Sequence, residues 1–570
     1  MSVTSRAGLR PEHVHVRLGD RFSRVAWPAA AMLVAAAVVV PIATLATSVL
    51  SPETEVWRQQ WRTRLPGQIA DTVTLLVGVA VASLVLGVGL AWLVSAHRFP
   101  GSRVLGWLLV LPLAMPAYIL GFVTLSVVGF TGPIQGWWRD VVGADAWFPP
   151  VRSIGGAIVV FTLVLYPYVY LLARAALRDQ AGGAYDVARS LGAGPVEAAR
   201  RVVLPLLRPA IAAGTAIVMM ETLTDFATVQ YFGVDTVSVG VFRIWRGTFD
   251  RDAASEIATL VLVFALLVIG LERTLRGRAR FGEAAGTHGG VAARRLHGWR
   301  GWGATATCGL VVLLSFGAPT ARLVTWAVAE ATGPRGTPLT GRFADFLGNS
   351  LVLAAVTGGV CLVAALVVAN GARFGGDRVT GTAVRLTAVG YAVPGPVVAI
   401  GVLLTLVGLD RLLAHVGLGL PGVVATGSFV GLVYAYSVRF LAPGLTAVES
   451  GLQQVPDELT SSARTLGARP VRIAAAVHLP LSRASVATAA VLVSVDALKE
   501  LPIALLLRPF GFDTLPVWVW NLASESRFEQ AALPALAILV VATVPVALLS
   551  RQLVRRDDEP ASGLVPSEAA

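Results

Sequence analysis

Charge is scarce in this chain. Only 14% of its 570 residues are Asp, Glu, Lys or Arg, and 55% are hydrophobic. Soluble domains carry roughly a quarter of charged residues, so this composition excludes a soluble globular protein. The apolar residues gather in about twelve runs of ~20 residues, the length that crosses the hydrocarbon core of a bilayer. The composition therefore predicts an all-α polytopic membrane protein.

The predicted spans form two sets of six. In the first half they lie near residues 25–50, 70–96, 104–130, 153–177, 209–231 and 256–273. In the second half they lie near residues 302–328, 348–370, 383–408, 421–441, 484–507 and 531–550.

Lysine and cysteine are also rare. Lys499 is the only lysine beside 45 arginines, and no Gly-Lys-Ser or Gly-Lys-Thr sequence occurs. A phosphate-binding P-loop needs that lysine, so we expect the chain neither to hydrolyse ATP nor to carry a cofactor.

Cys308 and Cys361 lie inside apolar runs, where we expect buried free thiols. An intramembrane enzyme is disfavoured because neither an HExxH motif nor a nucleophile–base set is present.

The arginines predict the orientation. With the N-terminus inside and alternating spans, the inner segments hold 31 of the 45 arginines. Basic residues concentrate on the cytoplasmic side of membrane proteins, so both termini are predicted to be cytoplasmic. The same distribution accounts for the net charge of +12 without a nucleic-acid partner. We expect a multi-pass protein of a bacterial cell membrane, with the lipid bilayer as its surroundings.

A polar segment occurs twice between apolar runs. Residues 186–205 read DVARSLGAGPVEAARRVVLP, and residues 461–480 read SSARTLGARPVRIAAAVHLP. Eleven positions agree at a constant spacing of 275 residues. Two equal polar insertions on one membrane face indicate two equivalent docking sites. An inert loop that happened to be duplicated is the alternative, and it is disfavoured because loops usually drift faster than spans.

Each copy is typical of a helix, a turn and a second helix. Gly192 is placed for a left-handed residue that ends the first helix, and Pro195 for the first turn of the second. Pro205 is expected to end that second helix before the next span. The second copy repeats these three positions at Gly467, Pro470 and Pro480.

Further matches extend the duplication to both halves. The matched pairs are Asp71-Thr72 with Asn349-Ser350, Pro116 and Gly121 with Pro396 and Gly401, and Phe232-Gly233 and Asp235-Thr236 with Phe510-Gly511 and Asp513-Thr514. Their common order predicts two parallel six-helix repeats. The predicted organisation is an N-terminal segment with the first span and an outer loop (1–65), a first repeat (66–274), a cytoplasmic linker (275–301), the seventh span with an outer loop (302–344), a second repeat (345–551) and a cytoplasmic tail (552–570).

The duplicated segments resemble the EAA loop of binding-protein-dependent ABC importer permeases. In that pattern, Glu-Ala-Ala is followed by three residues, Gly, nine residues, an aliphatic residue, one residue and Leu-Pro. This chain matches it from Gly onward in both copies. The resemblance implies a type I permease fold with a cytoplasmic coupling-helix loop in each repeat. The residues that it implies for ATPase coupling are Asp186, Ala188, Gly192, Leu204, Pro205, Ser461, Ala463, Gly467, Leu479 and Pro480.

The resemblance also implies partners and a substrate. A separate ABC ATPase in two copies would bind ATP, and an extracytoplasmic binding protein would deliver the substrate. The start of the motif departs from the pattern, because Asp186 keeps the acid and Ser461 loses it, so the two docking sites would be unequal if the acid contacts the ATPase. The stretches 221–226 with 231–233, and 499–502 with 508–515, are similar to fused ferric-iron permeases.

Ferric iron is therefore the expected substrate, with thiamine, aminophosphonate or another small solute as alternatives. A twelve-helix secondary transporter is the rival from another class. It has no reason to carry two helix-turn-helix insertions.

Charged residues at membrane depth are costly and often functional. Glu221 and Asp225 are four residues apart and are expected to share a helix face. Asp496 and Glu500 are their equivalents in the second half, and Lys499 replaces Thr224. One hypothesis is an acidic translocation pathway for a cation, since carboxylates suit hard cations. The other is a structural set of ion pairs. We propose no metal coordination here.

Two smaller groups have structural interpretations. Tyr166, Tyr168 and Tyr170 are expected to anchor a span at the membrane interface. Glycines 78, 87 and 89 are expected to permit close helix packing.

Overall fold

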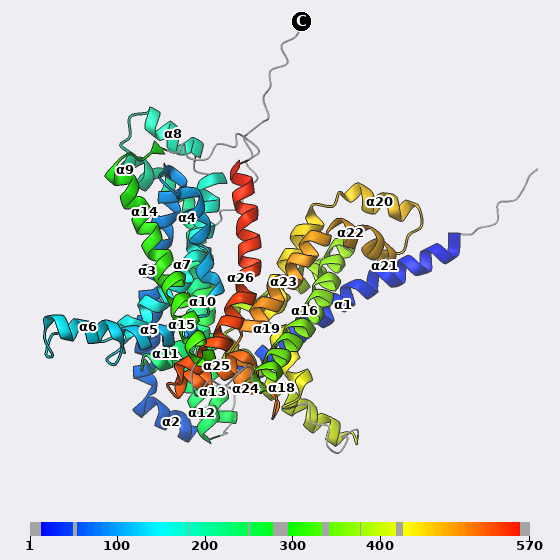
Figure 1. Cartoon of the computed structure of the whole chain (residues 1–570). Coiled ribbons are helices and arrows are strands. Elements are labelled where there is room, and N and C mark those ends of the chain that lie inside the picture. The colour runs from blue at the N-terminus through cyan, green and yellow to red at the C-terminus, as the bar shows by residue number, and fades with distance from the viewer. Residues whose placement is uncertain are drawn as a thin grey trace, which may run out of the picture. The chain divides into compact units, whose positions relative to one another are not determined.

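A computed structural model describes residues 13–48, 54–179, 182–248, 251–276, 294–332, 341–376, 378–417 and 426–558. Within these residues, eleven helices are long and apolar enough to cross a membrane, and a bent helix pair at Pro470–Leu481 and Arg483–Lys499 makes a twelfth. The predicted all-α fold with about twelve spans is confirmed (Figure 1).

The elements of the first half are α1 (His13–Ser48), α2 (Thr54–Thr63), α3 (Leu65–Ala96), β1 (His97–Arg98), α4 (Ser102–Leu108), η1 (Leu111–Ala114), α5 (Ala117–Val128), α6 (Pro133–Val142), α7 (Ile154–Asp179), α8 (Gly182–Ser190), α9 (Pro195–Ala198), η2 (Ala199–Val203), α10 (Leu204–Thr224), α11 (Ala227–Tyr231), α12 (Val237–Thr248) and α13 (Arg251–Arg276).

The elements of the second half are β2 (Arg294–Arg295), α14 (Trp299–Val312), η3 (Leu313–Gly317), α15 (Ala318–Thr332), α16 (Gly341–Gly375), α17 (Arg378–Val389), η4 (Gly390–Ala392), α18 (Gly395–His415), α19 (Phe429–Gln453), α20 (Asp457–Thr465), α21 (Pro470–Ile473), η5 (Ala474–His478), α22 (Leu479–Leu481), α23 (Arg483–Lys499), α24 (Pro502–Leu507), α25 (Leu515–Ser524) and α26 (Phe528–Asp558).

The helices form two compact units that are discontinuous in sequence. Among the described residues, unit 1 contains 13–43, Leu353–Tyr391 and Val433–Ala497, and unit 2 contains the other described segments. Most of α1 thus belongs with helices of the second half. Within this unit, the hydroxyl of Tyr434 donates a hydrogen bond to the carbonyl of Ala37 at 2.7 Å. Conversely, α14 and α15 belong with the first half. The sequence repeats and the contact units are therefore different divisions of the chain.

Small residues set the packing in unit 2, where α7 lies between α3 and α10. A Cβ at Gly87 would lie 2.8 Å from Cβ of Val169, and one at Gly214 would lie 2.9 Å from Cα of the same residue. A Cβ at Gly78 would likewise collide with the side chain of Ile158, whereas one at Gly89 would have no neighbour within 4 Å. The predicted role in close packing is confirmed for two of the three glycines of α3.

The third and ninth spans are broken at matching places. A 3-10 turn, η1 or η4, precedes a proline that opens the next helix, Pro116 before α5 and Pro394 before α18. In each case the proline carbonyl accepts from the amides three and four residues later. The predicted match of Pro116 with Pro396 is therefore wrong by two residues. Only Pro394 has the extended backbone that starts the helix.

Two of the three tyrosines of α7, Tyr166 and Tyr170, are buried and do not form the predicted interface anchor, whereas Tyr168 is half-buried. Tyr166 and Tyr170 are fully buried, and their hydroxyls donate to the carbonyls of Leu109 (2.8 Å) and Gly106 (2.9 Å). Both carbonyls lie where α4 ends, and a broken helix leaves such groups without a helical partner. The two tyrosines are therefore buried, because their hydroxyls supply the hydrogen bonds that these buried carbonyls need.

The end of the predicted linker is ordered. Residues 277–293 lie outside the described part, but His97–Arg98 pairs in parallel with Arg294–Arg295. The amide of Leu296 then donates to the carbonyl of Arg98 at 2.9 Å. This short sheet attaches the start of α14 to the end of α3.

Candidate functional site

The first helix of each duplicated loop ends in the same turn. We define the first loop as residues 182–206 and the second as residues 457–481. Gly192 (φ +89°) and Gly467 (φ +77°) are both left-handed, as the sequence predicts. The amide of Ala193 donates to the carbonyl of Ala188 at 3.1 Å, and the equivalent bond in the second loop measures 3.0 Å. This pattern is a Schellman C-cap, which satisfies carbonyls at the helix end.

The second helix of each loop begins as predicted, but only the one in the second loop ends at its predicted proline, where α22 stops at Leu481 directly after Pro480. Pro195 opens α9 and Pro470 opens α21, and each helix widens into a five-residue π-helical segment, η2 or η5. The first loop then continues through Pro205 into α10, so the prediction that this proline ends the helix is wrong. Pro205 is the second residue of the restarted α-helix, where a missing N–H is tolerated.

The two loops differ after the π-helical segments. In the second loop α22 ends at Leu481, and the axis bends by 83° before α23. Ser482 lies at the bend, where its hydroxyl and its amide both donate to the carbonyl of His478. The equivalent residue of the first loop is Leu207, which packs into the core cluster of unit 2, and the first loop continues into α10 as one unbroken span. A serine in place of a buried leucine thus accompanies the bend.

Each loop presents the same exposed apolar residues. Leu191 is 82% exposed and its equivalent Leu466 is 87% exposed. The other exposed pairs at the same spacing of 275 are Val196 with Val471, Leu204 with Leu479, and Leu206 with Leu481. Exposed apolar patches mark interaction sites. In unit 2, the first loop lies at the opposite end of the long helices from α2 and α12 (Figure 1).

The acid at the start of the motif differs between the loops. Asp186 and Ser461 are both exposed at equivalent positions of α8 and α20, with Ala188 and Ala463 half-buried behind them. The second loop has acids one turn earlier, at Asp457 and Glu458.

Two of the predicted pathway residues act as helix caps. In unit 2, Asp225 accepts hydrogen bonds from the amide (2.7 Å) and the hydroxyl (2.6 Å) of Thr228 at the start of α11. Glu500 accepts from the amide of Ile503 at 3.3 Å at the start of α24. Asp225 therefore lies beyond α10 in extended backbone, and the prediction that it shares a helix face with Glu221 is wrong. Free amides at the start of the short helix attract the carboxylate away from that face.

The remaining charged residues lie on the preceding helices. Glu221 is in the last turn of α10, and Lys499 is the last residue of α23. Both are half-buried. Asp496 is also on α23 but belongs to unit 1, whereas Glu221, Asp225, Lys499 and Glu500 belong to unit 2.

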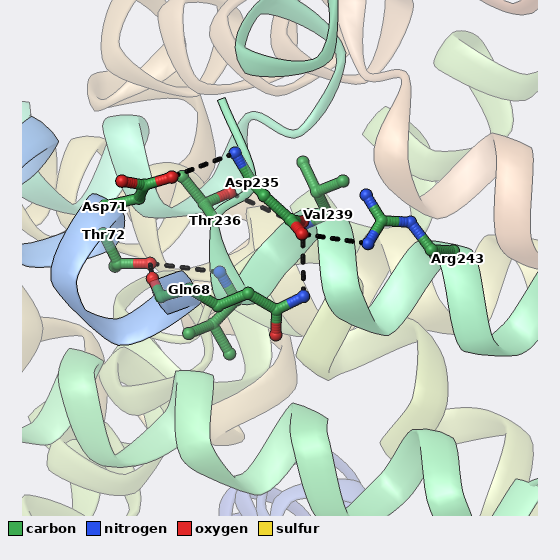
Figure 2. Close-up of polar contacts among 8 residues, drawn as sticks. Gln68, Asp71, Thr72, Asp235, Thr236, Val239 and Arg243 are labelled. Atoms are coloured by element: carbon green, nitrogen blue, oxygen red, sulfur yellow. Dashed lines mark hydrogen bonds and ion pairs between the residues drawn. The ribbon is translucent and has the colours of Figure 1, made fainter. Parts of the chain in front are cut away.

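A hydrogen-bonded latch follows the short helix α11. Thr72 of α3 accepts from the amide of Val237 at 3.0 Å. Figure 2 shows the neighbouring Asp71 accepting from the amide of Asp235 at 3.3 Å. The side chain of Asp235 in turn accepts from Gln68 (3.2 Å) and pairs with Arg243 of α12 (3.0 Å). The latch thus fixes the segment between α11 and α12 to the first turns of α3.

The second half repeats this latch with other side chains. Ser350 accepts from the amide of Leu515 at 2.8 Å, as Thr72 does in the first half. Asn349 donates to the carbonyl of Asp513 at 3.0 Å, and that aspartate pairs with Arg508. The two motif pairs that recur in the sequence therefore contact each other in both halves.

The sequence that forms the two duplicated loops also matches a known protein family. The model of the family "Binding-protein-dependent transport system inner membrane component" matches residues 83–275 and 361–556, which is more than half of the chain and includes both duplicated loops. The chain belongs to this family. It is a multi-pass permease with two copies of the family's domain. Its eleven or twelve apolar helices are consistent with a place in a bacterial inner membrane. The family implies an ATPase and a substrate-binding protein as partners.

Three relatives of this permease differ in how much of it they cover. An Fe(3+)-transport system permease protein, FbpB 2, of Haemophilus influenzae is 25% identical over 502 residues, 86% of this chain and 91% of the relative. The sulfate transport system permease protein CysT of Salmonella typhimurium is 30% identical and covers 41% of this chain and 84% of its own length. A putative 2-aminoethylphosphonate permease protein, PhnU, of Salmonella choleraesuis is 25% identical and covers 38% of this chain and 77% of its own length.

Sequence reasoning missed Tyr118 of α5, the helix that packs against the short helix α11 capped by Asp225. It is 4% exposed, and its hydroxyl has no hydrogen-bond partner among the described residues. Gly121, one turn later on α5, packs against Thr228, which is the residue that Asp225 holds. Nothing in the sequence separates this tyrosine from other aromatic residues of the spans.

Arg439 of the permease was also missed, although its signal was visible. It lies within the apolar helix α19 of unit 1, is 3% exposed, and has its guanidinium 5.6 Å from the ring of Phe440. An arginine inside a span is rare and usually faces the protein interior.

Proposed function

We propose that this permease is the pore of a bacterial importer for ferric iron, that two ATPase subunits dock on its two duplicated loops, and that both termini are cytoplasmic. The observation that carries the importer proposal is the twofold family match together with two loops of equal turn geometry and equal exposed residues. A fused chain with two loops suits two ATPase subunits. The arginine distribution supports a cytoplasmic position for both loops.

Iron is the substrate that coverage and chemistry favour. The Fe(3+)-transport relative extends along both repeats, whereas the sulfate and aminophosphonate relatives each cover less than half of the chain. The carboxylates of Asp225 and Glu500 occupy equivalent breaks in two spans. Carboxylate and phenol oxygens are ligands that hard cations prefer, and anions such as sulfate would be repelled there. We infer that iron passes these breaks as substrate and does not remain as a cofactor.

Uptake by cells tests the substrate. Deleting the gene should abolish high-affinity uptake of radiolabelled Fe(III) and leave uptake of sulfate unchanged, and the gene on a plasmid should restore it. Loss of sulfate or 2-aminoethylphosphonate uptake with normal iron uptake would replace iron by that solute.

A second measurement tests the importer proposal itself. In proteoliposomes, transport should require an ATPase, ATP and a substrate-loaded binding protein. Transport driven by an ion gradient without ATPase would instead support the secondary transporter.

A further inference from the structure

The second duplicated loop is tied to α16 by a buried histidine. In unit 1, Nδ1 of His478 lies 2.7 Å from Oδ1 of Asn370, and Nε2 lies 3.0 Å from the hydroxyl of Thr460. The amide group of Asn370 donates to the carbonyl of Leu366 at 2.9 Å, so its oxygen is the acceptor for the histidine. Nδ1 of the imidazole therefore carries the proton, and Nε2 accepts from Thr460. All three side chains are buried.

This bridge joins three elements. Asn370 is on α16, Thr460 is on α20, and His478 ends η5. The ring of Phe374, one turn after Asn370, stacks on His478 at 5.3 Å between centroids. Both helices of the second loop are thus held to the end of one long helix.

Arg373 strengthens the same attachment. Its guanidinium donates to the carbonyls of Leu452 and Val455, where α19 ends, and it pairs with Asp457 at 2.9 Å. Charge-assisted bonds of this kind are stronger than neutral ones. The entry to the loop is therefore fixed to α16 as well.

The first loop has no such bridge at the equivalent positions of unit 2. Thr460 and His478 correspond to Tyr185 and Val203 at the loop spacing of 275 residues, and Asn370 corresponds to Trp92 at the spacing of 278 that relates Asp71-Thr72 to Asn349-Ser350. Tyr185 instead packs edge-on against Trp92 of α3, with 5.6 Å between ring centroids. Val203 is buried in the apolar core. The first loop is attached by apolar packing alone at these positions.

The location of His478 also couples the bridge to the bend. Its carbonyl accepts both hydrogen bonds of Ser482, the residue at which the axis turns by 83°. Its ring and its carbonyl thus connect the loop to α16 on one side and to α23 on the other.

We infer that His478 is a positioning residue that locks the second loop to α16, so that motion of a docked ATPase is passed to α16 and α23 as one rigid element. The first loop passes motion into α10 through one unbroken span. The two docking sites are therefore mechanically unequal. This inference rests on the proposed docking of an ATPase, but the lock itself does not.

Hydrogen exchange of the full chain in nanodiscs, without partners, tests the lock. His478→Val installs the first-loop residue, and Thr460→Val removes one bond should the first variant fold poorly. Peptides from residues 457–481 should exchange at least tenfold faster, and peptides from residues 182–206 should not change. Unchanged exchange in both variants, or equal acceleration in both loops, would overturn the lock.

Reconstitution with the ATPase and binding protein then tests the positioning role. In Thr460→Val the ATP hydrolysed per substrate transported should rise at least threefold, with ATPase binding retained. An unchanged ratio in a variant whose second loop exchanges faster would show that the lock has no role in coupling. If the unmodified chain binds no ATPase, the proposed function fails while the exchange result stands.

Discussion

Replacing Gly192 isolates the contribution of one backbone conformation to ATPase docking. The residue has φ +89°, and a Cβ built on it meets no atom within 4 Å. Substitution therefore introduces no clash, and its cost is backbone strain alone. The next residues in the chain carry the exposed apolar positions, so the turn sets how they are presented.

The strain predicts the size of the effect. A non-glycine residue in the left-handed region costs roughly 1–2 kcal/mol. Since 1.4 kcal/mol is a factor of ten, Gly192→Ala should raise the Kd for the ATPase by ~5- to 30-fold if docking needs this turn. Gly192→Val should have a larger effect, because β-branched residues tolerate positive φ least. Gly192→Asn should be milder, because asparagine visits this region more readily.

The assay is a binding titration of the purified ATPase against the chain in nanodiscs. Gly194→Ala is the matched control, because this glycine lies in the same loop, is equally free of near neighbours, and has no positive φ. The reasoning would be refuted if Gly194→Ala weakened binding as much as Gly192→Ala. Equal weakening by Asn and Val at position 192 would refute it as well.

Three further predictions concern the other features. Thr72→Val and Ser350→Ala should each lower unfolding free energy by ~1–3 kcal/mol, because a buried amide loses its acceptor; a Tm unchanged in thermal unfolding would contradict this. Asp225→Asn should keep the α11 cap but slow iron uptake, whereas Asp225→Ala should also cost ~1 kcal/mol of stability; full uptake by the Asn variant would make the residue purely structural. Tyr118→Phe should leave Tm unchanged or raised, because the hydroxyl has no partner, while reducing iron uptake in the same cells; a lower Tm with normal uptake would exclude a pathway role.

Local patterns in the sequence were sufficient for several features. The left-handed turns at Gly192 and Gly467 followed from glycine just before a proline-initiated helix, because φ preferences act within a few residues. The number of spans followed from the length of apolar runs. The buried free cysteines were confirmed because each lies within such a run.

Other features needed contacts between distant residues. The sequence showed that the pairs around Thr72 and Val237 recur, but not that they bond, because the partners are 165 residues apart in both halves. The cap formed by Asp225 competes with the helix face, and the free amides of α11 decide the outcome. Pro205 is accommodated by a π-helical segment, which local propensity does not reveal.

By itself, the sequence determined the membrane class, the two parallel repeats and the turn in each loop, because periodicity, length and glycine placement are local properties. Only the tertiary structure decided that α1 groups with helices of the second half, that two carboxylates cap short helices, and that His478 bridges Asn370 and Thr460. An isolated histidine and an isolated asparagine carry no signal of each other at a separation of 108 residues. Burial brings them together and leaves each as the other's hydrogen-bond partner.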